Sequence, residues 1–167
     1  MTDRAIFNRR YTSFTPGSSP VWLVNGAGVT TTAVNTQQFT AGAVLLQGQP
    51  VYVSGTYALP AIAASGTDAA NFNVIGITAE AAALGSGVAV NLDDIAVIND
   101  VNITADSALI PGQYYYLSKY QGEVTRYSTA SGTVSAADGY AALVGLGLAL
   151  STNELQVEVE APVTLYS

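Results

Sequence analysis

The sequence contains neither cysteine nor histidine, and only 10% of its 167 residues are charged. The absence of cysteine excludes disulfide bonds and thiolate metal sites, and the absence of histidine removes the commonest general base and the commonest imidazole metal ligand. Carboxylate pairs or a hard-cation site could still support chemistry, but the 12 Asp and Glu residues are scattered along the chain. We therefore expect no enzyme activity, no cofactor, no metal ion and no small-molecule substrate.

Long hydrophobic runs are also missing. No apolar stretch approaches the length of a membrane-spanning helix, and the segment after Met1 lacks the apolar core of a secretory signal. We expect a soluble protein that is made in the cytoplasm and does not bind membranes. A low charge content leaves much of the surface neutral, and this favours association with other proteins as part of the function.

Two segments of the chain resemble each other. Gly48–Ser54 and Gly112–Ser118 share the pattern Gly-Gln-x-x-Tyr-x-Ser, and each begins a series of strand, turn and strand patterns. Each series then continues into an apolar run centred on glycine and ends in a strand of alternating apolar and polar residues. The glycine-centred runs are Val74–Ile77 and Leu143–Gly147, and the alternating strands are Val88–Leu92 and Leu155–Val159.

These patterns predict an all-β fold, either a small β-barrel or a sandwich, built from two similar β units with an extended N-terminal arm. The arm covers residues 1–19 and contains the glycine- and proline-rich stretch Thr15–Pro20, which blocks regular structure at its end. The predicted β domain covers residues 20–167, with one unit at about 39–98 and the other at about 103–166.

Each unit contains one predicted hairpin. In the first, Val51–Val53 pairs with Tyr57–Leu59 across a turn that contains Gly55. In the second, Tyr114–Leu117 pairs with Glu123–Tyr127. Thr78–Leu84 is rich in alanine and is also compatible with one short helical turn.

The basic residues are concentrated at the N-terminus. Arg4, Arg9 and Arg10 fall in the first ten positions, whereas from Thr12 onward only two basic residues stand against eleven acidic ones. This acidic body would repel a polyanion, so we expect no binding to nucleic acid. A basic arm can instead reach an acidic partner surface or a neighbouring copy of the same protein, or it can simply be a solvated terminus.

Aromatic residues mark candidate contact surfaces. Alternation along a strand places Tyr115 on one face of its sheet, with Tyr114 and Tyr116 on the other. Tyrosine favours strands and offers a hydroxyl to the wetter side, which indicates a packed strand or an interface strand. The only tryptophan, Trp22, is interpreted as a core or interface anchor.

The last strand carries a row of carboxylates. Glu154, Glu158 and Glu160 alternate with apolar residues, so they form an outward face that either discourages edge pairing or serves as a docking surface. The same groups could instead hold a hard cation, with Asp93 and Asp94 as the analogous pair in the first unit. No loop has the Asp and Gly spacing of a calcium motif, and we therefore predict no metal site.

In these features the chain resembles the capsid decoration, or cement, proteins of tailed bacteriophages. The resemblance covers about residues 39–166. It implies a small β-rich protein, commonly a homotrimer, that binds the major capsid protein on the outer surface of an expanded icosahedral shell and stiffens it. The residues that carry it are Gly112–Ser118, Val144–Leu150 and Leu155–Leu165, with a weaker echo in Gly48–Ser54, Ile75–Glu80 and Val88–Ile98.

This interpretation assigns a role to two sets of residues. The arm is expected to bind the capsid by clamping an adjoining subunit, through Arg4, Phe7, Arg9, Arg10, Tyr11 and Phe14. The interface between the subunits of the trimer is expected to contain Trp22, Tyr114, Tyr115 and Tyr116.

A receptor- or carbohydrate-binding knob of a capsid or tail fibre is the alternative. Trp22 or Tyr120 would then be the stacking platform for a sugar. The only loop that groups an aromatic residue with a carboxamide and an acid is Tyr120–Glu123.

Overall fold

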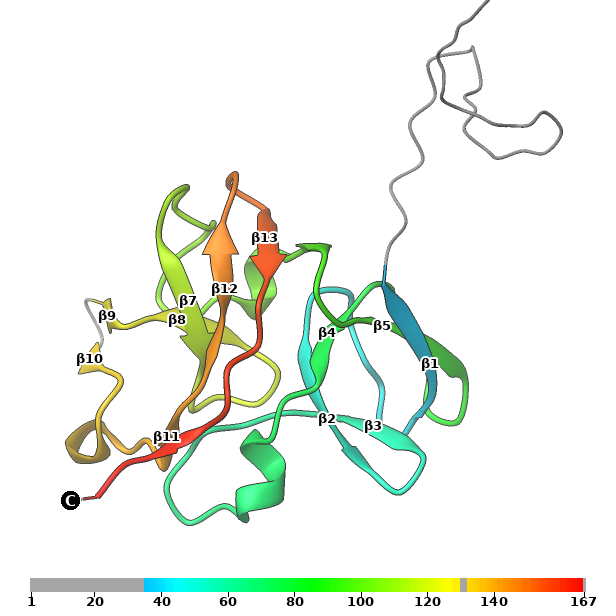
Figure 1. Cartoon of the computed structure of the whole chain (residues 1–167), viewed down its shortest axis with the longest axis horizontal. Coiled ribbons are helices and arrows are strands. Elements are labelled where there is room, and N and C mark those ends of the chain that lie inside the picture. The colour runs from blue at the N-terminus through cyan, green and yellow to red at the C-terminus, as the bar shows by residue number, and fades with distance from the viewer. Residues whose placement is uncertain (1–34, 130–131, 167) are drawn as a thin grey trace, which may run out of the picture. The chain divides into compact units, whose positions relative to one another are not determined.

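The structure, a computed structural model, describes residues 35–129 and 132–166 (Figure 1). This part of the chain is built from β-strands and three short 3₁₀ turns, and it contains no α-helix, so the all-β prediction is confirmed. None of its helical segments has the length and hydropathy needed to cross a bilayer. The predicted arm and Trp22 lie outside the described residues.

Five strands close into a small barrel. The order around it is β1-β3-β2-β4-β5, and β1 completes the ring by pairing antiparallel with β5 and parallel with β3. The closed ring leaves no free edge, so all five strands are protected from pairing with other chains. The strands are β1 (Thr36–Ala41), β2 (Pro50–Ser54), β3 (Tyr57–Pro60), β4 (Gly76–Thr78) and β5 (Gly87–Asn91).

A second five-stranded sheet follows, in the order β6-β13-β12-β7-β8. Every pair of neighbours in it is antiparallel. Figure 1 shows β7, β8, β12 and β13 side by side in this sheet. Its strands are β6 (Ile95–Val97), β7 (Tyr114–Leu117), β8 (Val124–Arg126), β12 (Gly145–Ala149) and β13 (Glu154–Val157).

Shorter elements complete the description. Two two-stranded ladders join β9 (Ser128–Thr129) to β10 (Gly132–Thr133) and β11 (Ala142–Leu143) to β14 (Val163–Thr164). The 3₁₀ turns are η1 (Ala69–Phe72), η2 (Asp100–Asn102) and η3 (Ala136–Asp138).

The barrel and the second sheet are two copies of one strand arrangement. In the barrel β3, β2, β4, β5 and β1 follow one another, and in the second sheet β8, β7, β12, β13 and β6 follow in the same order and chain sequence. The equivalence extends to backbone hydrogen bonds: Gly48 and Gln49 exchange them with Thr78, as Gly112 and Gln113 do with Ala149. We call β1–β5 the first repeat and β6, β7, β8, β12 and β13 the second repeat.

The second repeat differs from the first by an insertion. In the first repeat Ala41 donates to Ser86 of the loop before β5 and also forms a parallel bridge with Ala58 of β3. In the second repeat these two roles are divided between Ile98, which donates to Asn153, and Ile103, which bridges to Val124. The η2 turn lies between these two residues, and β6 and β8 do not pair as strands, so the second sheet is not a closed barrel.

The insertion also ties the repeats together. The side-chain amides of Asn99 and Asn102 both donate to the backbone oxygen of Gln47, at 3.2 and 2.7 Å. Asn102 is buried, so this hydrogen bond satisfies a polar group that would otherwise be costly to remove from water.

Two apolar cores match the duplication. The barrel encloses a small cluster, and the equivalent strands and loops of the second repeat also carry buried apolar residues. The larger cluster contains the interior of the second repeat together with residues of the first, so it joins the two. The barrel cluster is Ala41, Leu45, Val51, Ala58, Val88 and Val90, and the buried residues on the equivalent segments of the second repeat include Ile98, Leu109, Tyr115, Val124, Leu155 and Val157.

Both predicted hairpins are confirmed, as the pairing of β2 with β3 and of β7 with β8 shows. The helical turn considered for Thr78–Leu84 is wrong. Ala82 instead forms a β-bridge with Leu45, with hydrogen bonds of 2.8 and 2.9 Å in both directions. This bridge and the burial of Leu45 outweigh the weak helical preference of the alanines.

Candidate interaction surface

Three tyrosines form a row on the outer side of the second sheet. The ring centroids of Tyr114 and Tyr116, both on β7, are 5.4 Å apart. Tyr127, which follows β8, meets Tyr116 edge to face with a centroid separation of 6.0 Å. Tilted and edge-to-face contacts of this kind are favourable for aromatic rings, and together the three rings form an apolar surface with polar hydroxyls.

Tyr114 is fixed by a carboxylate from the C-terminal segment. Its hydroxyl donates to Glu160 at 2.9 Å, and the backbone oxygen of Glu158 lies 3.2 Å away. Desolvation by burial, followed by the hydrogen bond to Glu160, raises the pKa of the Tyr114 hydroxyl well above its usual value. A Cβ at Gly145 would lie 2.9 Å from the Glu160 side chain and 3.1 Å from the Tyr114 ring, so glycine is needed beneath this pair.

Aliphatic side chains extend the row across the sheet. Ile95, Gln156, Leu148 and Tyr114 are paired one to the next across four strands, so their side chains share one face. Leu148 and Ile95 are 40% and 42% exposed. We call the set Ile95, Tyr114, Tyr116, Tyr127 and Leu148 the tyrosine face.

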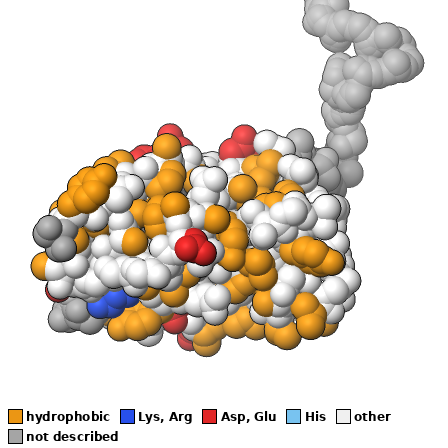
Figure 2. All heavy atoms as spheres, turned by 90° about the horizontal axis from the view of Figure 1, so that it is seen from below, with side chains coloured by type: hydrophobic (Ala, Val, Ile, Leu, Met, Phe, Trp, Pro, Cys, Tyr) orange, Lys and Arg blue, Asp and Glu red, His pale blue; other side chains and the backbone are white. Residues whose placement is uncertain are grey.

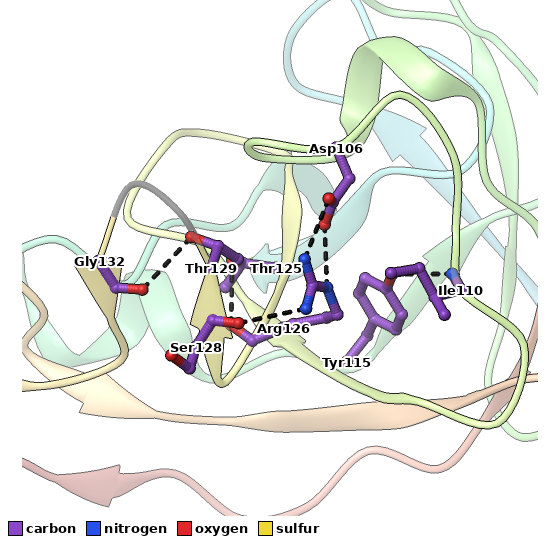
Figure 3. Close-up of polar contacts among 8 residues, drawn as sticks. All are labelled: Asp106, Ile110, Tyr115, Thr125, Arg126, Ser128, Thr129 and Gly132. Atoms are coloured by element: carbon purple, nitrogen blue, oxygen red, sulfur yellow. Dashed lines mark hydrogen bonds and ion pairs between the residues drawn. The ribbon is translucent and has the colours of Figure 1, made fainter.

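The two cations of the described chain are both engaged within it. Lys119 donates to the backbone oxygen of Asp138 at 2.7 Å and lies near the rings of Tyr120 and Tyr140. Arg126 pairs with Asp106, as Figure 3 shows. Eleven acidic side chains therefore dominate the electrostatics of residues 35–129 and 132–166.

Charged groups are also sparse. Figure 2 shows one face of the molecule on which hydrophobic and uncharged side chains cover most of the surface, with isolated acidic and basic side chains. Among the residues that the structure describes, no three or more Asp or Glu side chains gather into a group that could hold a metal ion.

The predicted interface residues separate into two groups. Tyr114 and Tyr116 lie half-buried on the outer side, where an interface would need them. Tyr115 is a correction: it is completely buried in the core of the second repeat, and its hydroxyl accepts a hydrogen bond from the backbone N–H of Ile110 at 3.0 Å. A side chain enclosed in its own chain cannot contact another subunit.

The remaining predicted positions fall outside the described residues. They are Trp22 and the arm residues Arg4, Phe7, Arg9, Arg10, Tyr11 and Phe14. Their roles stay predictions.

The loop proposed for sugar binding has its acid already occupied. Glu123 accepts a hydrogen bond of 2.7 Å from the Thr104 hydroxyl, which in turn lies 2.6 Å from the buried Ser118 hydroxyl. Tyr120 is exposed, but Lys119 approaches its ring at 5.7 Å. This arrangement ties the loop to the core of the second repeat.

Leu148, Ile95 and Tyr127 are members of the tyrosine face that the sequence did not single out. Leu148 lies in the apolar run Leu143–Leu150, in which every residue is apolar or glycine, so alternation gives no sign of which side chains point outward. The pairing of Leu148 with Tyr114 is the signal, and it requires knowledge of the strand register.

Family models and curated proteins assign this surface no role. No protein-family model matches the chain, and the search of curated proteins found no match either.

Proposed function

We propose that this protein decorates and stabilises the outer surface of an icosahedral bacteriophage capsid, bound to the major capsid protein. The observation that carries the proposal is the tyrosine face, an exposed apolar surface on a duplicated β framework. Exposed patches of this kind, with aromatic residues at their centre, are typical of protein contact sites. The resemblance of the sequence to capsid decoration proteins is the reason for proposing a phage capsid as the assembly.

The chemistry of the chain fits a structural role. Both cations of the described residues are used internally, and the polar network at Thr104, Ser118 and Glu123 is satisfied within the fold. Binding to a shell asks for a rigid body with a complementary surface, and needs neither a nucleophile nor a general base. Many copies on one lattice also turn weak individual contacts into strong joint binding.

In this proposal the N-terminal arm supplies the contact with the capsid, and the tyrosine face joins neighbouring copies of the protein. The sequence of the arm contains three arginines and three aromatic residues, and such a segment can pair with carboxylates and fill apolar pockets on an adjoining capsid subunit. An arm that becomes ordered on binding adds contact area at an entropic cost, so its contribution is expected to depend on salt.

The test uses expanded shells assembled from the major capsid protein of the same phage. The full chain should sediment with the shells, and both Tyr127→Glu and a chain without residues 1–19 should bind at least tenfold more weakly. Val163→Glu is the matched control, because Val163 is an exposed β14 residue outside the tyrosine face. Undiminished binding of both altered proteins, or no binding by the full chain, would contradict the proposal.

A further inference from the structure

The two repeats carry the same outer face, and only one of these faces is covered. Pro50 pairs with Ile77 on the outer side of the barrel, and Tyr114 pairs with Leu148 at the equivalent position of the second repeat. Ile77 is 0% exposed and belongs to the core cluster that joins the repeats, whereas Leu148 is 40% exposed. The face that is buried between the repeats in one case is therefore open in the other.

The β7–β8 turn supplies part of the surface that meets the first repeat. The backbone N–H of Gly122 donates to Ala61 at 2.8 Å, and Ala63 donates to the backbone oxygen of Ser118 at 2.9 Å. The side chain of Gln49 lies against Gly122, where an added Cβ would be only 2.6 Å from its amide nitrogen. The first repeat is thus seated on a hairpin turn of the second.

The counterpart of this turn in the first repeat is the β2–β3 turn. The pair Val53 and Ala58 at its base corresponds to Leu117 and Val124 at the base of the β7–β8 turn. Tyr57 at this turn is exposed, and it lines a shallow pocket together with Gly42, Ser54, Leu59 and Leu84. Leu84, from the loop between β4 and β5, is 68% exposed, so the pocket beside the turn presents apolar surface.

We propose that the tyrosine face of one copy binds the β2–β3 turn and the Leu84 pocket of a second copy. This contact between two copies would resemble the contact between the two repeats within one chain, in which a hairpin turn of one repeat covers the outer face of the other. It rests on the proposed function and names the subunit contact of that assembly. Because two different surfaces meet, the contact is heterologous, and repeated heterologous contacts close into a ring when the rotation allows it. A homotrimer is such a ring.

The proposed contact between copies is made by side chains. It does not repeat the backbone hydrogen bonds that join the two repeats within the chain. Tyr127 stands where Ala61 stands in the first repeat, but its backbone oxygen already accepts a hydrogen bond from Val134 at 2.8 Å. The strands β9 and β10, which follow Tyr127, have no counterpart in the first repeat. The exposed rings and Leu148 are therefore the groups that carry the contact.

Variants that place a charge on either surface test whether these two different surfaces meet. Leu148→Glu places a charge on the tyrosine face, and Leu84→Glu places one in the pocket at the β2–β3 turn. By sedimentation velocity we expect a trimer for the unaltered protein and for Val163→Glu, and a monomer for each of the other two variants. Circular dichroism melting curves show whether all four proteins are folded. Full association of either Leu84→Glu or Leu148→Glu, or a monomeric unaltered protein at its highest soluble concentration, would overturn the proposal.

Cross-linking identifies the touching surfaces directly, because the chain contains no cysteine of its own. Gln113 corresponds to Gln49, which touches the turn within the chain, and Thr56 lies in the β2–β3 turn. With a short bismaleimide, the double variant Thr56→Cys, Gln113→Cys should form covalent trimers, and an equimolar mixture of the two single variants should form covalent dimers. Each single variant alone should stay monomeric on a denaturing gel. Covalent dimers from one single variant would show a symmetric contact and overturn the proposal.

The outcome is separable from that of the shell-binding test. Cross-linked trimers that fail to bind shells would contradict the decoration role and leave the subunit contact standing. Shell binding without Thr56–Gln113 cross-links on the shell would contradict the subunit contact alone.

Discussion

Arg126 and Asp106 form a bidentate ion pair, with Nε to Oδ2 and Nη2 to Oδ1 both at 3.0 Å. Both side chains are largely shielded from solvent, at 24% and 20% exposure. Figure 3 shows that the guanidinium of Arg126 also reaches the backbone oxygen of Ser128, so the pair links β8 to β9 and to the loop that follows η2. The guanidinium of Arg126 is thus engaged with groups of its own chain.

Arg126→Met is expected to lower the free energy of unfolding by about 2 kcal/mol, because it leaves the shielded Asp106 carboxylate without its donors. Arg126→Lys keeps the charge but loses the fork geometry, so its loss should be smaller. Urea denaturation measures both. Equal stability of all three proteins would show that the pair contributes nothing.

Ala105→Gly is expected to stabilise the protein by about 0.5 kcal/mol. Ala105 is the one non-glycine residue of the described chain with a positive φ, 67°, and it immediately precedes Asp106. Glycine removes the cost of the left-handed conformation, and this gain exceeds the entropy that glycine adds to the unfolded chain. A lowered urea midpoint would contradict this expectation.

Gly147→Ala is expected to destabilise the second sheet by roughly 3 kcal/mol or more. A Cβ at this position would lie against the backbone oxygen of Gln156 on β13, and the φ of 148° disfavours any side chain. Gly87→Ala is the matched control, because a Cβ there meets only the Gln38 side chain at 3.6 Å. Thermal unfolding should separate the two variants clearly, and similar melting temperatures would argue against the close strand approach at Gly147.

The hydrogen bonds of Asp138 are expected to make the stability of the protein depend on pH. Its carboxylate accepts hydrogen bonds from the backbone N–H of Thr133 at 2.9 Å and from the Ser135 hydroxyl at 3.2 Å. The bond from Thr133, followed by that from Ser135, holds the pKa of Asp138 below its usual 3.8. A lowered pKa in the folded state means that this contribution to stability is present above pH 3.8 and is lost as the pH falls through the lowered pKa.

Asp138→Asn should therefore melt at a lower temperature than the unaltered protein at pH 6, and the difference should shrink as the pH falls below 3.8. Melting curves of both proteins over this range make the comparison. A difference that stays constant with pH would exclude the carboxylate as its source.

The sequence contains enough information to predict the strands with clear alternation. Val51, Val53 and Leu59 point to a hairpin through period-two patterning and the adjacent Gly55, and the structure contains that hairpin. Tyr114 and Tyr116 are likewise placed together on one face by alternation alone. The similarity of Gly48–Ser54 to Gly112–Ser118 indicates two related units, and in the structure these segments lead into the equivalent strands β2 and β7.

Other features depend on tertiary contacts that no local pattern encodes. Ile95–Val97 is grouped with the first unit by its position in the chain, but as β6 it pairs with β13 of the second sheet. Ile77 and Leu148 look alike in sequence, yet one is buried between the repeats and the other is exposed. The difference arises because the second repeat covers the first, and only the folded chain reveals which outer face is left open.

Electron cryomicroscopy of expanded shells mixed with the purified protein tests the central claim most directly. The decoration role predicts regularly spaced additional density on the outer surface of the shell at three-fold or quasi-three-fold positions, with the tyrosine face buried between neighbouring copies. Smooth shells, with the protein remaining free in solution at saturating concentration, would contradict it.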